Sequence, residues 1–319
     1  MAKLAFLFPG QASQYPGMGR DLAEKFDVAR RTFDEADAAL GFPISKVCFE
    51  GTEDDLKLTE NTQPGILTVS VAAFRVLEEK GFVPDMVAGH SLGEYSALVA
   101  AGGLDFADAL RIARKRGKYM QEAVPAGQGA MAAILGLAPA EVIEITKKAA
   151  QGEVVSASNL NSPEQTVISG AAAAVKRAVE IASQNGAKRA VILPVSAPFH
   201  CELMGPAQKR IEADLNAVKF HDLRFPLVTN VDAEAISSGE DAREALVRQV
   251  CLPVHWLDSV HYMIEAGVHM FVEVGPGKVL SGLLRQIDRA VRCVGVEDSA
   301  SLQAALEKIQ QSRAEIAEA

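Results

Sequence analysis

One pentapeptide constrains this chain more than any other stretch: Gly89-His90-Ser91-Leu92-Gly93. It is a G-x-S-x-G pattern that follows a short apolar run at residues 86–88, typical of a buried parallel strand, and precedes a helical pattern at 94–101. A sharp turn between a strand and a helix exposes the serine hydroxyl, and the N–H groups that begin the helix stabilise developing negative charge. Glycines suit such a turn because neighbouring segments crowd it. The pattern predicts that Ser91 is a nucleophile, although similar turns also occur by chance in α/β proteins.

The segments around this pentapeptide alternate between strands and helices, which is typical of a mostly parallel sheet covered by helices. We predict strands at residues 4–8, 226–230, 270–274 and 290–296, and helices at 64–80, 105–123, 200–217, 241–252, 255–266 and 302–319. The predicted fold class is therefore α/β, with an α/β-hydrolase-like large domain formed by residues 1–124 and 197–319.

Residues 125–196 have a different pattern. Pro125 and Gly127 interrupt the alternation, and the segment that follows reads as β-α-β-β-α-β, the order of a ferredoxin-like domain. Pro194 and Pro198 then mark the return to the large domain. We predict an inserted subdomain whose two hinges lie close together, with a ligand-binding cleft between the two domains.

Composition excludes several classes of function. The net charge of −9 and the isoelectric point near 5.3 argue against a general affinity for nucleic acid or for anionic membranes. No apolar run is as long as the roughly 20 residues of a membrane span, and the N-terminus leads directly into a strand pattern, so we expect a cytoplasmic protein. The cysteines are far apart in sequence, which favours free thiols over a metal site or disulfides: Cys48, Cys201, Cys251 and Cys293.

A serine nucleophile needs a base and an oxyanion hole. His200 is the best placed histidine, because it lies where the insert returns to the large domain and its ring can face the cleft. His90 we interpret as part of the scaffold. No acidic residue stands out as a partner for His200, so a backbone carbonyl is an alternative. The backbone N–H groups of Gln11 and Leu92 are candidate oxyanion donors, although the segment around Gln11 also reads as a plain turn.

A basic run follows the predicted nucleophile by about one element. It is usual for such a run to be a solvated helix face, but helical spacing points its members in different directions, so that one arginine can face inward and bind a carboxylate. The run comprises Arg111, Arg114, Lys115, Arg116 and Lys118. A second glycine-rich segment, at residues 275–278, resembles a phosphate-binding loop only in part, and we favour a structural turn there.

Several motifs in order give a more specific signal than any one of them. They are Phe8-Pro9-Gly10-Gln11 with Ser13-Gln14, the stretch from Gly89 to Ser96, Arg116-Gly117, Asn159 with Asn161-Ser162-Pro163, Val195-Ser196-Ala197-Pro198-Phe199-His200, and Glu273-Val274-Gly275-Pro276-Gly277. With these motifs the whole chain resembles the malonyl-CoA:acyl carrier protein transacylases of type II fatty-acid synthesis.

The resemblance implies a role for each matching residue. Ser91 would be the nucleophile, His200 its base, Arg116 the ligand of the malonyl carboxylate, and the main-chain carbonyl of Gln249 the group that orients the histidine. Gln11 and Leu92 would form the oxyanion hole, and the pocket would include Phe199, His90 and Asn159. One departure is Ala12, where the family commonly has glycine; alanine costs little there unless its φ is positive.

The resemblance also implies the reaction and the partners. The substrates would be a coenzyme A thioester and acyl carrier protein, with no cofactor and no metal, and we expect a monomer. Leu92 and Phe199 look like the malonyl pattern, because a phenylalanine leaves little room for an α-methyl group. Two alternatives stay open. One is a serine thioesterase or esterase acting on acyl-CoA, which shares the same nucleophile and base. The other is a protein-interaction module that has the same fold but no enzymatic activity.

Overall fold

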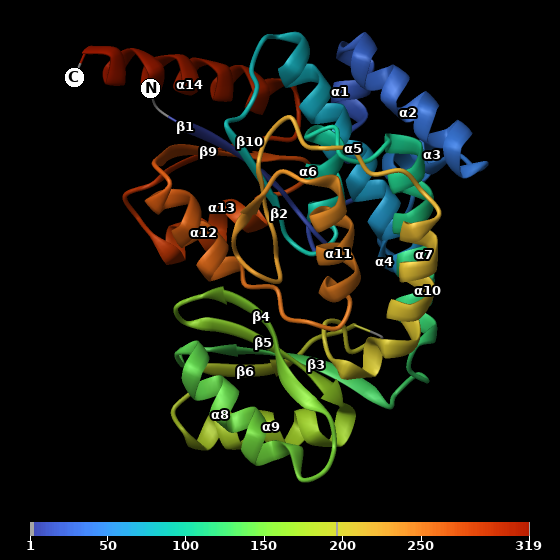
Figure 1. The fold of residues 1–319 in the computed structure, drawn as a ribbon, viewed down its shortest axis with the longest axis vertical. Helices are drawn as coiled ribbons and strands as arrows, with labels where there is room; N and C mark the ends of the chain where they lie inside the picture. Colours follow the sequence, from blue (N-terminus) through green and yellow to red (C-terminus); the bar gives the residue numbers. More distant parts are fainter. Residues whose placement is uncertain (1–2, 196, 319) are drawn as a thin grey trace.

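The computed structural model describes residues 3–195 and 197–318, with side chains to residue 312. Its larger sheet has the order β10-β9-β1-β2-β7-β8, and every pairing is parallel except that of β7 with β8 (Figure 1). The mostly parallel sheet predicted for the large domain is confirmed. Its strands are β1 (Lys3–Phe8), β2 (Met86–Gly89), β7 (Leu227–Val228), β8 (Ala235–Ile236), β9 (Val268–Val274) and β10 (Arg292–Val296).

Strand β1 is buried on both faces, because alternate side chains point to opposite sides of the sheet. Leu4, Phe6 and Phe8 pack into a core with α5 (Thr59–Glu79) and α7 (Phe106–Glu122). Ala5 and Leu7 pack on the other side with α12 (Trp256–Glu265) and α13 (Val279–Ile287). Helices on both faces therefore hold the strand ends that carry the site.

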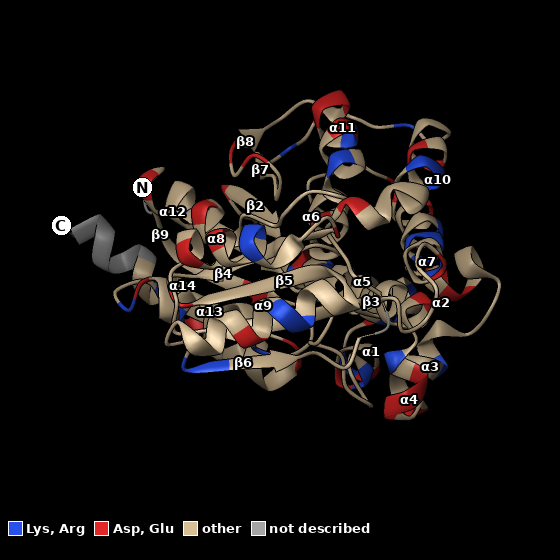
Figure 2. Ribbon diagram, turned by 90° about the horizontal axis from the view of Figure 1, so that it is seen from below, with Lys and Arg blue, Asp and Glu red and all other residues tan. Residues whose placement is uncertain are grey.

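The remaining helices complete these two layers and the connections between them. They are α1 (Arg20–Lys25), α2 (Asp27–Leu40), α3 (Ile44–Glu50), α4 (Glu53–Lys57), α6 (Gly93–Ala100), the 3-10 turn η1 (Glu202–Met204), α10 (Gly205–Asn216), α11 (Gly239–Gln249) and α14 (Ser299–Glu318). Acidic and basic segments are interspersed over these helices (Figure 2).

The second sheet is antiparallel, with the order β4-β5-β3-β6, and the element order β-α-β-β-α-β is the one predicted. Helices α8 and α9 pack on it, at the bottom of Figure 1. The two hinges meet, because a Cβ added to Gly129 would lie 2.5 Å from the ring of Pro198. The exact division at residues 125–196 stays a prediction. The elements are β3 (Gly129–Leu135), α8 (Pro139–Ala150), β4 (Val155–Ser162), β5 (Gln165–Ala171), α9 (Ala172–Gln184) and β6 (Arg189–Ile192).

The sequence misplaced several element boundaries. Helix α5 begins at Thr59 rather than at Pro64, because one further turn is held by hydrogen bonds from Asn61 and Thr62 N–H to the Leu58 carbonyl. Strand β4 continues to Ser162, so the turn is shorter than predicted. The helix predicted to open at His200 begins only at Gly205, because His200 itself has a left-handed φ of 58°. Helices α1 to α4 were not predicted.

Candidate active site

Ser91 lies in the tight turn between β2 and α6, in the left-handed region with a φ of 51°. The glycines on either side are required by crowding. A Cβ at Gly89 would lie 2.0 Å from the backbone of Gly93, and a Cβ at Gly93 would lie 1.9 Å from the carbonyl oxygen of Phe8. A side chain at Gly89 would therefore open the turn itself, and one at Gly93 would force the turn away from the end of β1.

His200 forms a hydrogen bond with Ser91. Its Nε2 lies 2.8 Å from Ser91 Oγ, and its Nδ1 lies 2.7 Å from the carbonyl oxygen of Gln249. A carbonyl can only accept, so Nδ1 carries the proton and Nε2 accepts from the serine hydroxyl. Burial, reinforced by the nearby Arg116 charge, lowers the pKa of His200 to about 3, which keeps the ring neutral at pH 7. The partner of Nδ1 is therefore a backbone carbonyl, the alternative to an acidic side chain that the sequence analysis had left open.

Arg116 is the member of the basic run that faces inward, with 1% of its surface exposed. Its Nη2 donates to Ser91 Oγ and to Gln249 Oε1, both at 3.0 Å, and its Nη1 donates to Gln63 Oε1 at 3.0 Å. Its Nε is buried and has no acceptor among the described residues. The other members lie on the helix surface: Arg111 pairs with Asp108, Lys115 with Asp214 and Lys118 with Glu122, and Arg114 covers the Phe42 ring.

Two buried side chains that the sequence analysis missed join these groups. Asn230 Oδ1 accepts from the Ser91 backbone N–H at 2.7 Å. Glu94 Oε2 accepts from Asn230 N–H and from Gln249 Nε2, both at 2.9 Å, while its Oε1 has no partner among the described residues. Burial raises the pKa of Glu94 to about 7. Gln63 was missed as well; only the position of Glu94 directly after the pentapeptide offered a signal.

The loop that carries Gln11 lies against the serine turn, since a Cβ at Gly10 would be 2.4 Å from the His90 carbonyl oxygen. Among the described residues, no acceptor is found for the backbone N–H of Gln11 or of Leu92. Ala12 has a positive φ of 80°, a backbone conformation that is unfavourable for alanine by about 1–2 kcal/mol relative to the right-handed region. Both N–H groups are thus available near Ser91 in a loop that alanine strains.

The three predicted pocket residues are only partly connected to the hydrogen-bonded pair of Ser91 and His200. His90 Nε2 lies 2.8 Å from Asn161 Oδ1, and its ring packs on Trp256. Asn159 is buried in β4, where its Oδ1 accepts from Ser158 Oγ. Phe199 is half-buried beside His200, and its carbonyl accepts from Ser169 Oγ at 2.6 Å. Their place in an acyl pocket stays a prediction. Ser196, which belongs to one of the motifs, lies outside the described residues.

A family model described as the acyl transferase domain matches residues 5–312 of this chain. The chain belongs to this acyl transferase family. This acyltransferase is 47% identical over 312 residues to the malonyl CoA-acyl carrier protein transacylase of Bacillus subtilis, covering 98% of both chains. Its structure superposes with a TM-score of 0.95 on the malonyl CoA-acyl carrier protein transacylase of Clostridium perfringens, at 41% identity and full coverage of both. A malonyl-transacylase in complex with its type II PKS acyl-carrier protein gives a TM-score of 0.94 at 47% identity, covering 96% of this chain and 100% of that one.

The other sequence features of the acyltransferase are structural. In the turn at residues 275–278, Gly277 N–H donates to Glu297 and Lys278 pairs with the same carboxylate, so the turn is already occupied by protein. Glu273 accepts from the first N–H groups of α13. The four cysteines are free, with Cys48 and Cys201 buried. Within the described residues, no cluster of three potential metal ligands is found, and no helix has the length and apolar character to cross a bilayer.

Proposed function

We propose that this acyltransferase moves the malonyl group of malonyl-CoA to the phosphopantetheine thiol of acyl carrier protein, in fatty-acid biosynthesis, by a ping-pong mechanism. The observation that carries the proposal is the buried guanidinium of Arg116 within 3.0 Å of Ser91 Oγ. No carboxylate of the described residues forms an ion pair with this buried guanidinium, and a malonyl carboxylate would supply the counter-charge. Relatives named for this reaction support the same substrates.

In the first half-reaction, Ser91 Oγ gives its proton to His200 Nε2 and attacks the thioester carbonyl. The backbone N–H groups of Gln11 and Leu92 would stabilise the oxyanion. As the tetrahedral intermediate collapses, the C–S bond breaks and the proton on His200 passes to the departing CoA thiolate. The products are free CoA and a malonyl ester on Ser91.

The second half-reaction runs the same steps in reverse with a different thiol. The phosphopantetheine thiol of the carrier protein gives its proton to His200, and its sulfur attacks the ester carbonyl. The C–O bond breaks, and the proton returns to Ser91 Oγ. The Gln249 carbonyl holds the imidazole in the correct tautomer throughout, in place of the acidic member of a Ser-His-Asp triad.

These steps use only protein groups and the two substrates, so the mechanism needs no cofactor. A thioesterase or esterase would share Ser91 and His200 but would admit water. A hydrolase of neutral esters has no use for a buried cation at the acyl position, and Arg116 therefore favours transfer of an acyl group that carries a carboxylate. Preference for malonyl over methylmalonyl, a monomeric state and a cytoplasmic location stay predictions.

The test is an intact mass measured after mixing the protein with malonyl-CoA. We expect one malonyl adduct in the wild type, none in Ser91→Ala, and loss of the adduct when holo acyl carrier protein is added. Release of free malonate without accumulation of the adduct would instead support a hydrolase. Absence of both adduct and malonate would support the interaction module.

A further inference from the structure

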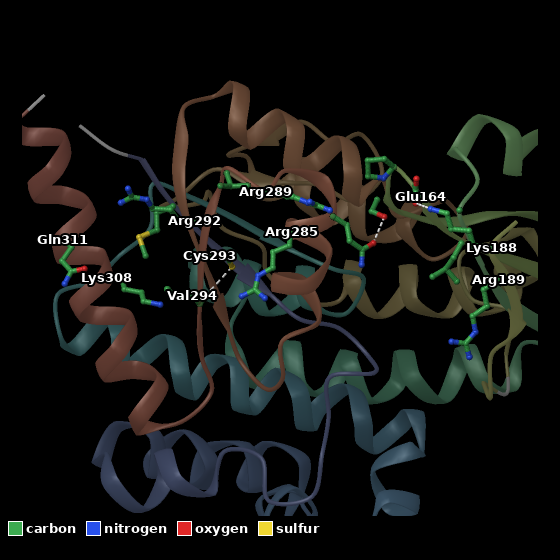
Figure 3. A pocket seen from close by; sticks show the side chains of 17 residues that line it. Glu164, Lys188, Arg189, Arg285, Arg289, Arg292, Cys293, Val294, Lys308 and Gln311 are labelled. Carbon is green, nitrogen blue, oxygen red and sulfur yellow. Dashed lines mark hydrogen bonds and ion pairs between the residues drawn. The ribbon is translucent and has the colours of Figure 1, made fainter.

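A large basic groove lies outside the active site (Figure 3). It has a volume of about 1290 Å³ and lies between the two sheets. One wall comes from the β4–β5 turn and the start of β6, and the other from α13, β10 and α14. Figure 3 shows Arg285 and Lys308 extending from α13 and α14 into the same space. We call this feature the seam groove.

The charge of the seam groove is opposite to that of the whole chain. Its lining holds one acidic side chain, Glu164, and six basic ones, whereas the chain has a net charge of −9. Lys188 pairs with Glu164 at 2.7 Å. No acidic group of the described residues lies within ion-pair distance of four of the other cations, which are Arg189, Arg285, Arg289 and Lys308. Unpaired cations gathered in a concave site repel one another, and a polyanionic ligand would relieve that repulsion.

The seam groove is also linked to the active site through its wall. Ser162 Oγ donates to Gln286 Oε1 at 2.9 Å, which joins β4 to α13 at the groove. The preceding residue, Asn161, contacts His90 Nε2 at 2.8 Å, and His90 directly precedes Ser91. From Ser162 in the groove wall, one step along the chain leads to Asn161, one hydrogen bond leads to His90, and one further step leads to Ser91. The groove wall and the serine turn thus belong to one hydrogen-bonded segment, and a long ligand that reacts at Ser91 is a candidate occupant of the groove.

We propose that the seam groove binds the phosphate groups at the nucleotide end of the CoA thioester. This inference rests on the proposed function, which supplies CoA as substrate. Arginine suits the role because its planar fork matches phosphate oxygens, and three of the four unpaired cations are arginines. A concave site of this size fits a nucleotide better than the convex surface of a protein partner.

The experiment compares two malonyl donors that differ only in the proposed contact. Malonyl-pantetheine keeps the thioester and the flexible arm but lacks the phosphates and the nucleotide. In the double variant Arg285→Ala/Arg289→Ala, we expect kcat/KM for malonyl-CoA to fall about tenfold or more, because two charge-assisted contacts are lost at an exposed site. Malonyl-pantetheine should be unaffected, and the loss with malonyl-CoA should shrink as salt is raised.

A matched control removes two exposed arginines from another helix. Arg30→Ala/Arg31→Ala on α2 changes the net charge equally but lies outside the groove lining, and should leave both donors unchanged. A direct readout is the affinity of Ser91→Ala for free CoA by calorimetry, with and without the two groove substitutions. We expect the dissociation constant to rise about tenfold in the groove variant.

Three results would overturn the assignment. Equal losses for malonyl-CoA and malonyl-pantetheine would mean that the arginines only support the fold. No loss with either donor would mean that the phosphates bind elsewhere. A loss confined to transfer onto acyl carrier protein would make the groove a docking surface for that partner. If wild-type protein forms no malonyl ester from either donor, the proposed function fails instead, and CoA affinity in Ser91→Ala still tests the groove.

Discussion

Arg116→Ala is the substitution that best separates recognition of a carboxylate from the chemistry at the serine. The guanidinium is 1% exposed, so its pairing with a malonyl carboxylate would be little screened by solvent. A charge-assisted hydrogen bond contributes about 1.5–3 kcal/mol, and we therefore expect kcat/KM for malonyl-CoA to fall about ten- to a hundredfold. The same residue also donates to Ser91 Oγ, so part of any loss is shared by every acyl donor.

The ratio of malonyl-CoA to acetyl-CoA kcat/KM removes that shared part, because acetyl lacks the carboxylate. We expect the ratio to fall by about ten- to a hundredfold in Arg116→Ala. Arg116→Lys should recover only part of the ratio, since a point charge cannot reproduce the planar fork. Arg114→Ala is the matched control: it removes the same charge from the same helix, at a side chain that covers Phe42. An unchanged ratio in Arg116→Ala would refute the reasoning and leave Arg116 with a structural role.

Three further substitutions test the groups around the serine. His200→Ala should slow acylation of Ser91 by about 10²–10⁴-fold or more in a stopped-flow measurement, and wild-type rates would remove His200 from the mechanism. Glu94→Gln should remove a pH dependence of stability: the raised pKa of Glu94, about 7 against 4.5, favours the folded state below about pH 4.5, and this contribution of up to about 3 kcal/mol is lost as pH rises through 7. The free energy of unfolding of both proteins is measured in urea at about pH 5 and about pH 8. If it changes equally with pH in the wild type and in Glu94→Gln, Glu94 does not titrate in this range. Ala12→Gly should raise the free energy of unfolding by up to about 1 kcal/mol, because φ is 80° at this position; a decrease would mean that the loop is not strained.

The local patterns of the sequence predicted both sheets and the crowded turn at Ser91. The glycines around Ser91 predicted a crowded turn, and the backbone of Phe8 and Gly93 does occupy the space that a side chain would need. Apolar runs and helical spacing predicted the parallel sheet, and the β-α-β-β-α-β order predicted the second sheet. Each of these signals depends on neighbours in sequence, through steric limits and the periodicity of burial.

Contacts between distant segments were decided only by the tertiary structure. Asn230 and Gln63 have no local pattern that marks them, yet each is buried and bonded to Ser91 or Arg116 from elsewhere in the chain. Which arginine of the basic run turns inward depends on how α7 packs on α5. The left-handed φ of His200 and the gathering of unpaired cations in the seam groove likewise arise from packing of separate elements. The physical reason is that a buried polar group is stable only with a partner, and the fold determines which partners are within reach.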